Sequence, residues 1–165
     1  MRPTTLCFPV RSDGMILLGR KKRGFGVQKW NGFGGKIEKN ETFRQCAIRE
    51  LWEETGLTAR PDDLALVAFL DFQYVAAPEL NHIGYVYFLR TYEGTPAASE
   101  EMEPQWFRPE QFPYDHMWKG DRTWLPMILA GRKIKGTVVF APNNEDVQEL
   151  TVTDVTELTE VEVNL

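Results

Sequence analysis

The segment that most constrains this chain runs from residue 41 to residue 56. Residues 41–55 contain neither glycine nor proline, and their apolar side chains recur at helical spacing. Gly56 follows directly, at the position where a left-handed residue commonly ends a helix. The spacing therefore predicts an amphipathic helix over 41–55. Its buried face is expected to consist of Ala47, Ile48, Leu51 and Trp52.

Three glutamates lie together on another face of this predicted helix. Glu50, Glu53 and Glu54 stand at i, i+3 and i+4, so they share an arc of about 100°. Most glutamate-rich helices simply present a solvated acidic face. Here, however, no lysine lies four residues on to relieve the repulsion, and carboxylates together with substrate phosphates are the ligands that Mg²⁺ and Mn²⁺ prefer. We therefore expect a divalent metal site on this helix.

A glycine-rich loop precedes the helix. Residues 24–35 contain five glycines, with Phe25, Trp30 and Phe33 between them. Glycine in such a loop allows backbone to approach another group closely. The loop is expected to border a binding site.

The rest of the chain indicates one mixed α/β domain, 1–165, without repeats or linkers. Turn residues 12–14 predict a hairpin between strands 4–11 and 14–20. Asp121 is expected to cap a second helix, which Gly131 ends. The acidic tail from about residue 154 is either an edge strand or a solvated extension. Further strands are predicted at 64–75, 83–92, 105–107, 137–140 and 147–155, and a helical turn at 109–112.

Composition excludes several classes of protein. The formal charge is −5, from 19 basic and 24 acidic residues, which argues against a nucleic-acid polymer or a membrane surface as partner. The longest apolar runs are about seven residues, too short to span a bilayer. The two cysteines, Cys7 and Cys46, form no framework, so a reducing compartment is expected. We expect a cytoplasmic monomer that acts on a small molecule.

The segment Gly35–Leu57 reads G-x₅-E-x₇-R-E-U-x-E-E-x-G-U, where U is aliphatic. This pattern resembles the signature of Nudix hydrolases at every defined position. The resemblance implies an α/β/α sandwich with a mixed sheet and metal-dependent hydrolysis of a nucleoside diphosphate linked to another group. It implies that Glu50, Glu53 and Glu54 act in catalysis. Arg49 and Glu41 lie two turns apart on the chain, so we expect them to pair and to support the start of the catalytic helix rather than to take part in the chemistry. The implied metal ligands are Gly35 through its carbonyl, Glu50, Glu53, Glu54 and, outside the motif, Glu101.

Further blocks, including Leu17–Gly26 and Trp30–Lys36, are similar to the branch of this family that hydrolyses oxidised purine nucleoside triphosphates such as 8-oxo-dGTP and 2-oxo-dATP. In that branch Asn31 and Asp121 would read the base edge and Trp118 would stack on its face. Lys36 directly follows the glycine loop, so we expect it to bind phosphate rather than to be an ordinary surface lysine. The basic cluster 20–23 either attracts the triphosphate or is a solvated strand end. The implied substrate-binding residues are Thr5, Lys21, Phe25, Asn31, Gly34, Lys36, Phe72, Trp118, Asp121, Trp124 and Phe140.

The chain departs from that branch at two positions. Gly120 stands where the branch has the first of two adjacent aspartates, so we expect Asp121 to be ionised and 8-oxo-dGTP to be preferred over 2-oxo-dATP. Asn81 stands where the branch uses methionine against the base. His82 and His116 are expected at the surface.

Two alternatives remain open from the sequence. One is a Nudix hydrolase for another substrate, such as ADP-ribose or an ordinary dNTP. The other is a nucleotide-sensing Nudix module without catalysis, although sensing requires no cluster of three glutamates.

Overall fold

The computed structural model describes residues 2–162, so residue 1 and the end of the predicted tail, 163–165, lie outside the described part. Ten helices and strands follow one another, joined in places by single 3₁₀ turns. They are β1 (Arg2–Pro9), β2 (Ile16–Lys21), β3 (Trp30–Asn31), α1 (Phe43–Thr55), β4 (Leu64–Tyr74), β5 (His82–Leu89), β6 (Met102–Phe107), α2 (Asp121–Leu129), β7 (Ile134–Phe140) and β8 (Val147–Asp154).

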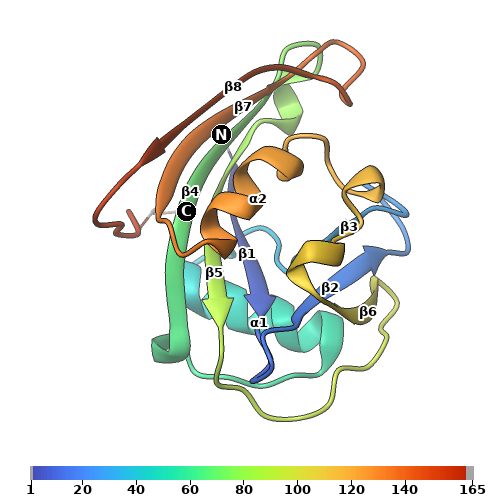
Figure 1. Cartoon of the computed structure of the whole chain (residues 1–165), viewed down its shortest axis with the longest axis vertical. Helices are drawn as coiled ribbons and strands as arrows, with labels where there is room; N and C mark the ends of the chain where they lie inside the picture. The colour runs from blue at the N-terminus through green and yellow to red at the C-terminus, as the bar shows by residue number, and fades with distance from the viewer. Residues whose placement is uncertain (1, 163–165) are drawn as a thin grey trace.

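The strands form two sheets (Figure 1). The larger has the order β1-β5-β4-β7-β8 and is mixed, because β1 pairs in parallel with β5 and β4 in parallel with β7, while the other two pairs are antiparallel. The smaller sheet, β3-β2-β6, is antiparallel. This mixed arrangement confirms the predicted fold class.

The two faces of the larger sheet bury different helices. Along β5, Tyr85 and Tyr87 belong to the core that contains α1, whereas Val86 and Phe88 belong to the core that contains α2. This alternation is what a strand covered on both faces requires. Figure 1 shows α1 and α2 on opposite sides of the sheet, which gives the α/β/α sandwich that the sequence predicted.

Helix α1 is held at both ends by its own sequence. Thr42 and Gln45 form a reciprocal capping box, and Gly56 ends the helix in the left-handed region with φ of 80°. The helix therefore begins two residues later than predicted and ends as predicted. One residue of its predicted buried face was wrong: Trp52 is 59% exposed, because the buried stripe is centred on Phe43, Ala47, Leu51 and Thr55.

The predicted hairpin between the first two strands was also wrong. Only one bridge, Val10 with Ile16, joins them near the turn. Beyond it the strands separate, because β1 pairs with β5 and β2 pairs with β6. The predicted cap of α2 was wrong as well. The N-cap residue is Gly120, and Asp121 is instead the first residue of the helix and makes no side-chain capping bond.

The acidic tail does not extend freely from the sheet. β8 is an edge strand that ends at Asp154. Farther along, one carboxylate oxygen of Glu160 accepts hydrogen bonds from Arg44 Nε at 2.8 Å and from the Tyr87 hydroxyl at 2.9 Å. The tail is thus attached to α1 and β5 as far as residue 161, whose N–H donates to the Tyr85 hydroxyl. No helix within residues 2–162 has the length and apolarity needed to cross a bilayer.

Candidate active site

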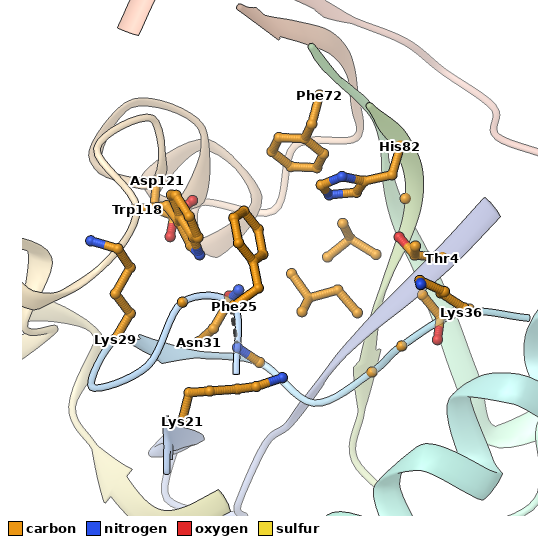
Figure 2. Close-up of a pocket in the computed structure, with 18 of the residues that line it drawn as sticks. Thr4, Lys21, Phe25, Lys29, Asn31, Lys36, Phe72, His82, Trp118 and Asp121 are labelled. Atoms are coloured by element: carbon orange, nitrogen blue, oxygen red, sulfur yellow. Dashed lines mark hydrogen bonds between the residues drawn. The ribbon is translucent and has the colours of Figure 1, made fainter. Parts of the chain in front are cut away.

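A cavity of about 360 Å³ opens above one face of the larger sheet. Strands β1 and β5 form its floor, the glycine loop and the start of α2 form its sides, and β4 and β7 close one end (Figure 2). Every residue that the sequence predicted to bind substrate lines it, namely Thr5, Lys21, Phe25, Asn31, Gly34, Lys36, Phe72, Trp118, Asp121, Trp124 and Phe140.

One end of the cavity is built where the glycine loop meets α1. The Gly34 N–H donates a hydrogen bond of 2.9 Å to Oε1 of Glu54. A Cβ on Gly34 would lie 1.8 Å from the Thr5 carbonyl oxygen, and one on Gly35 would lie 2.6 Å from Oε1 of Glu50. No other residue type can bring backbone this close. The Gly35 carbonyl accepts a hydrogen bond of 3.0 Å from the Thr5 N–H.

The carboxylates at this end are buried to different degrees. Glu54 is only 4% exposed, and burial, followed by the nearby charge of Glu50, raises its pKa to about 8. Burial also raises the pKa of Glu50. The Glu53 side chain, by contrast, is 48% exposed and contacts Arg49 at 3.3 Å.

A divalent cation fits this donor set, although the ligands are not gathered into a closed cluster. Among residues 2–162, no three acidic, histidine or cysteine side chains are close enough together to hold a metal ion. Glu50 and Glu54 nevertheless face a glycine backbone with no room for a Cβ, and burial disfavours their charged forms. Carboxylates and backbone carbonyls are the oxygen ligands that a hard cation takes.

Arg49 connects the carboxylates, as the sequence predicted for its pairing with Glu41. Its Nε and Nη2 bind the two oxygens of Glu41 at 2.6 and 2.9 Å. Its Nη1 lies 3.0 Å from Glu50 Oε1 and 3.3 Å from Glu53 Oε2. The Glu41 carboxylate raises the pKa of Arg49 further, so this side chain is a fixed positive charge beside the glutamates.

The other end of the cavity is aromatic. The Trp118 ring lies 5.0 Å from Phe25 and 5.6 Å from Phe140, centroid to centroid. Asn31 lies below these rings, and its Oδ1 accepts from the Gly32 N–H at 2.9 Å, which leaves its amide NH₂ to donate (Figure 2). Planar rings beside a side-chain amide suit a heterocyclic base.

Asp121 differs from its expected state. It is 3% exposed, and burial raises its pKa to about 7, so the carboxyl is not firmly ionised at neutral pH. Its Oδ2 has no hydrogen-bond partner among the described residues. Gly120 does not lie where a second aspartate could face the base. It does not line the cavity, and a Cβ on it would point against the sheet, 3.1 Å from Val138 Cγ1. Burial, rather than the absence of a neighbouring aspartate, therefore determines the protonation of Asp121.

Sequence reasoning missed several residues of the cavity. His82 was expected at the surface, yet it lines the cavity and stacks on Phe72. Asn81 instead accepts a hydrogen bond of 2.7 Å from the Tyr74 N–H, and its neighbour Leu80 faces the cavity. The alternation of side chains along β5 could have shown that His82 faces the cavity, because His82 and Val86 stand on the same face of the strand. Other missed residues are Arg2, Thr4, Lys29 and Tyr74.

Glu101 and most of the basic cluster 20–23, which the sequence placed around the phosphates and the metal, do not face the cavity. Glu101 accepts hydrogen bonds from Arg23 at 2.7 and 2.9 Å, although it lies near enough to Glu54 to raise the pKa of that carboxyl. Arg20 pairs with Glu103 at 2.5 Å. Of the basic cluster 20–23, only Lys21 lines the cavity.

Comparison with known proteins gives consistent results. A family described as NUDIX domain matches residues 1–128. Oxidized purine nucleoside triphosphate hydrolase from Danio rerio is 44% identical over 131 residues, or 79% of this chain and 82% of that protein. The mouse protein of the same name is 44% identical over 76% of this chain and 78% of its own length. A crystal structure of a mutator MutT protein from Bacillus halodurans superposes with a TM-score of 0.79 at 24% identity, covering 92% of this chain and 97% of that one, and supports the fold.

Proposed function

Since the chain belongs to the Nudix hydrolase family, we propose that it hydrolyses oxidised purine nucleoside triphosphates such as 8-oxo-dGTP to the monophosphate and pyrophosphate. This activity would remove damaged precursors from the nucleotide pool. One observation carries the proposal: a single cavity has an aromatic end, which suits a base, and a carboxylate end, which suits metal-bound phosphates. The names of the zebrafish and mouse relatives support it.

The aromatic end suits the base of such a substrate. The base would stack on Trp118 with Phe25 nearby, and Asn31 and Asp121 would bind its polar edge. Oxidation at C8 turns the purine N7 from an acceptor into a donor and adds an acceptor oxygen. A side-chain amide and a carboxyl poised near its pKa can meet such a mixed edge, because together they both donate and accept.

The carboxylate end suits the phosphates. Lys21 and Lys36 both line the cavity and would bind phosphate oxygens. Nudix hydrolases generally use a divalent metal, and we propose Mg²⁺, with Mn²⁺ as a substitute, which would neutralise charge on the triphosphate. The ligands would be Gly35 O, Glu50, Glu53, Glu54 and Glu101, the last after release from Arg23. One of these carboxylates would take the proton of the attacking water as the bond between the α- and β-phosphates breaks.

A phosphate-release assay with Mg²⁺ tests this function. The panel would contain 8-oxo-dGTP, 2-oxo-dATP, dGTP, ADP-ribose and a dinucleoside polyphosphate. We expect pyrophosphate from the oxidised purines at a higher kcat/KM than from dGTP. Preference for ADP-ribose would indicate another Nudix substrate class, and binding without turnover on any member would indicate a sensor.

We also propose that residues 1–165 act as one domain and that the enzyme is a cytoplasmic monomer with no nucleic-acid polymer or membrane as partner. The net charge of −5 and the two buried free cysteines support this assignment. Sedimentation at micromolar concentration would test the oligomeric state.

A further inference from the structure

Residues 21–29 form a closed turn beside the cavity, with a lysine at each end. The Lys21 N–H donates a hydrogen bond of 3.0 Å to the Lys29 carbonyl, and both lysines line the cavity. Burial raises the pKa of Glu54, and the charge of Lys21 opposes this effect. Burial also raises the pKa of Asp121, where the opposing charge is that of Lys29. The two lysines therefore act at opposite ends of the cavity, and Lys29 belongs to the aromatic end.

The ammonium group of Lys29 has two partners at that end. Its Nζ lies 4.9 Å from the centroid of the Trp118 ring and 3.1 Å from Oε2 of Glu145. The Lys29 side chain is only 21% exposed, and a cation held over a ring away from water is attracted more strongly than one at the surface. Trp118 lies between Lys29 and Phe25, so the cation fixes the ring from the side opposite Phe25 (Figure 2).

Glu145 belongs to the turn between β7 and β8, residues 141–146, which we call the β7–β8 tip. The side chain of Asn143 fixes this turn, because its Oδ1 accepts hydrogen bonds from the N–H groups of Glu145 and Asp146 at 3.0 and 2.9 Å. Asp146 in turn pairs with Lys119, in the segment that leads into α2. Two ion pairs thus fasten the β7–β8 tip to the two segments that build the aromatic end.

We propose that Lys29 is a positioning residue for the base: its ammonium group, fixed by Glu145, holds the Trp118 ring in place for stacking. The inference rests on the proposed function. A ring that is already held loses less freedom when the base binds, so the contact improves affinity for the base. On this account Lys29 does not bind phosphate, because its charge is engaged by a carboxylate at the aromatic end.

The test measures, by calorimetry with Mg²⁺ present, the affinity for 8-oxo-dGMP, the expected product, and for inorganic triphosphate, which has no base. Lys29→Gln should weaken the binding of 8-oxo-dGMP by about 3- to 10-fold and change the binding of triphosphate by less than about twofold. The kcat at saturating 8-oxo-dGTP should stay within about twofold, so that the loss appears in KM. Lys29→Arg keeps a cation over the ring and should restore most of the affinity.

Glu145→Gln distinguishes positioning from attraction of phosphate, because the two roles predict opposite signs. A lysine that attracts phosphate would be freed by this change, and triphosphate would bind more tightly. We expect instead that 8-oxo-dGMP binds about 2- to 5-fold more weakly, with no further loss when Lys29→Gln is added, since the two residues act as a unit. Asp154→Asn, which breaks the exposed ion pair with Arg132 at the other end of β8, is the matched control and should change neither affinity.

The outcomes separate this inference from the proposed function. Wild-type protein that hydrolyses 8-oxo-dGTP, together with a Lys29→Gln variant that keeps its affinity for 8-oxo-dGMP, would overturn the positioning role alone. Equal losses for both ligands in Lys29→Gln, or tighter triphosphate binding in Glu145→Gln, would overturn it as well and make Lys29 a phosphate-binding residue. Wild-type protein that neither hydrolyses 8-oxo-dGTP nor binds its monophosphate would overturn the proposed function and the inference together.

Discussion

The backbone N–H of Gly34 donates a hydrogen bond of 2.9 Å to the buried carboxylate of Glu54. This bond joins the glycine loop to the last turn of α1 at the cavity wall. Strand β1 leaves no space for a side chain at Gly34, because a Cβ there would fall 1.8 Å from the Thr5 carbonyl oxygen. The loop, the helix and β1 therefore have to move together if they move at all.

Gly34→Ala should consequently lower the free energy of unfolding by about 3 kcal/mol or more, since backbone rather than a flexible side chain blocks the new methyl group. Gly14→Ala provides the contrast. Gly14 has open space around it but a φ of +86°, so alanine there should cost only about 1 kcal/mol. Urea denaturation of both variants measures the difference, and similar losses would contradict this packing argument.

Glu53→Gln should reduce kcat by roughly 10²- to 10⁴-fold, because it keeps the shape of the side chain but removes a ligand charge and a proton acceptor. Product affinity should change much less, since the aromatic end is separate. EDTA should abolish wild-type activity and excess Mg²⁺ should restore it. Glu149→Gln, an exposed residue of β8, is the control. Near wild-type turnover of Glu53→Gln in saturating Mg²⁺ would remove Glu53 from the metal site.

Arg49→Lys should lower the free energy of unfolding by about 1–3 kcal/mol and also lower kcat. Lysine keeps the charge, but it cannot reproduce the two bonds to Glu41 while also contacting Glu50. Arg60→Lys, at an 81% exposed side chain paired with Asp63, should cost less than about 0.5 kcal/mol. Equal stability of the two variants would show that the bonds of Arg49 to Glu41 and Glu50 add no more to the free energy of unfolding than an exposed ion pair does.

Asn31→Ala should lower kcat/KM for 8-oxo-dGTP by the equivalent of about 1–3 kcal/mol, because polar groups of the base lose a partner inside the cavity. The Gly32 N–H would also lose its acceptor, so protein stability has to be measured in parallel. A triphosphate that lacks the base serves as the control substrate and should be affected less. Equal losses with both substrates would place Asn31 outside the base site.

Asp121→Asn should change how the stability of the ligand-free protein depends on pH. The folded protein holds the Asp121 proton with a pKa of about 7, and its ordinary value is 3.8. Between these values the folded state binds more protons than the unfolded state, so wild-type stability falls as pH rises. Relative to Asp121→Asn, wild-type should therefore lose about 2–4 kcal/mol between pH 4 and pH 8. Thermal unfolding across this range measures it, and a constant difference would contradict a raised pKa.

The exposed Asp115 offers a control for that series, because Asp115→Asn should change stability little at any pH.

The sequence was most informative where local chemistry determines structure. Gly56 correctly predicted the end of α1, and the substrate-binding residues that the family resemblance implied all line one cavity. It was least informative where the outcome depends on distant partners. The turn at 12–14 could not indicate that β1 pairs with β5, and the side-chain charge of Asp121 depends on burial that no local pattern records. His82 was misplaced for the same reason, since its surroundings come from β1 and β4.

The parallel pairing of β1 with β5 also has a consequence for how the chain is made. During synthesis each residue of β1 is added 80 residues before its partner in β5, as in the pair Arg2 and His82, and β1 has no hydrogen-bonded neighbour in the larger sheet until β5 follows. Helix α1 and strand β4 are made in between, so they can form before β1 pairs with β5. The nucleotide cavity, whose floor is this pair of strands, is therefore completed late, and slow closure of such a long-range contact is expected to limit the rate of folding.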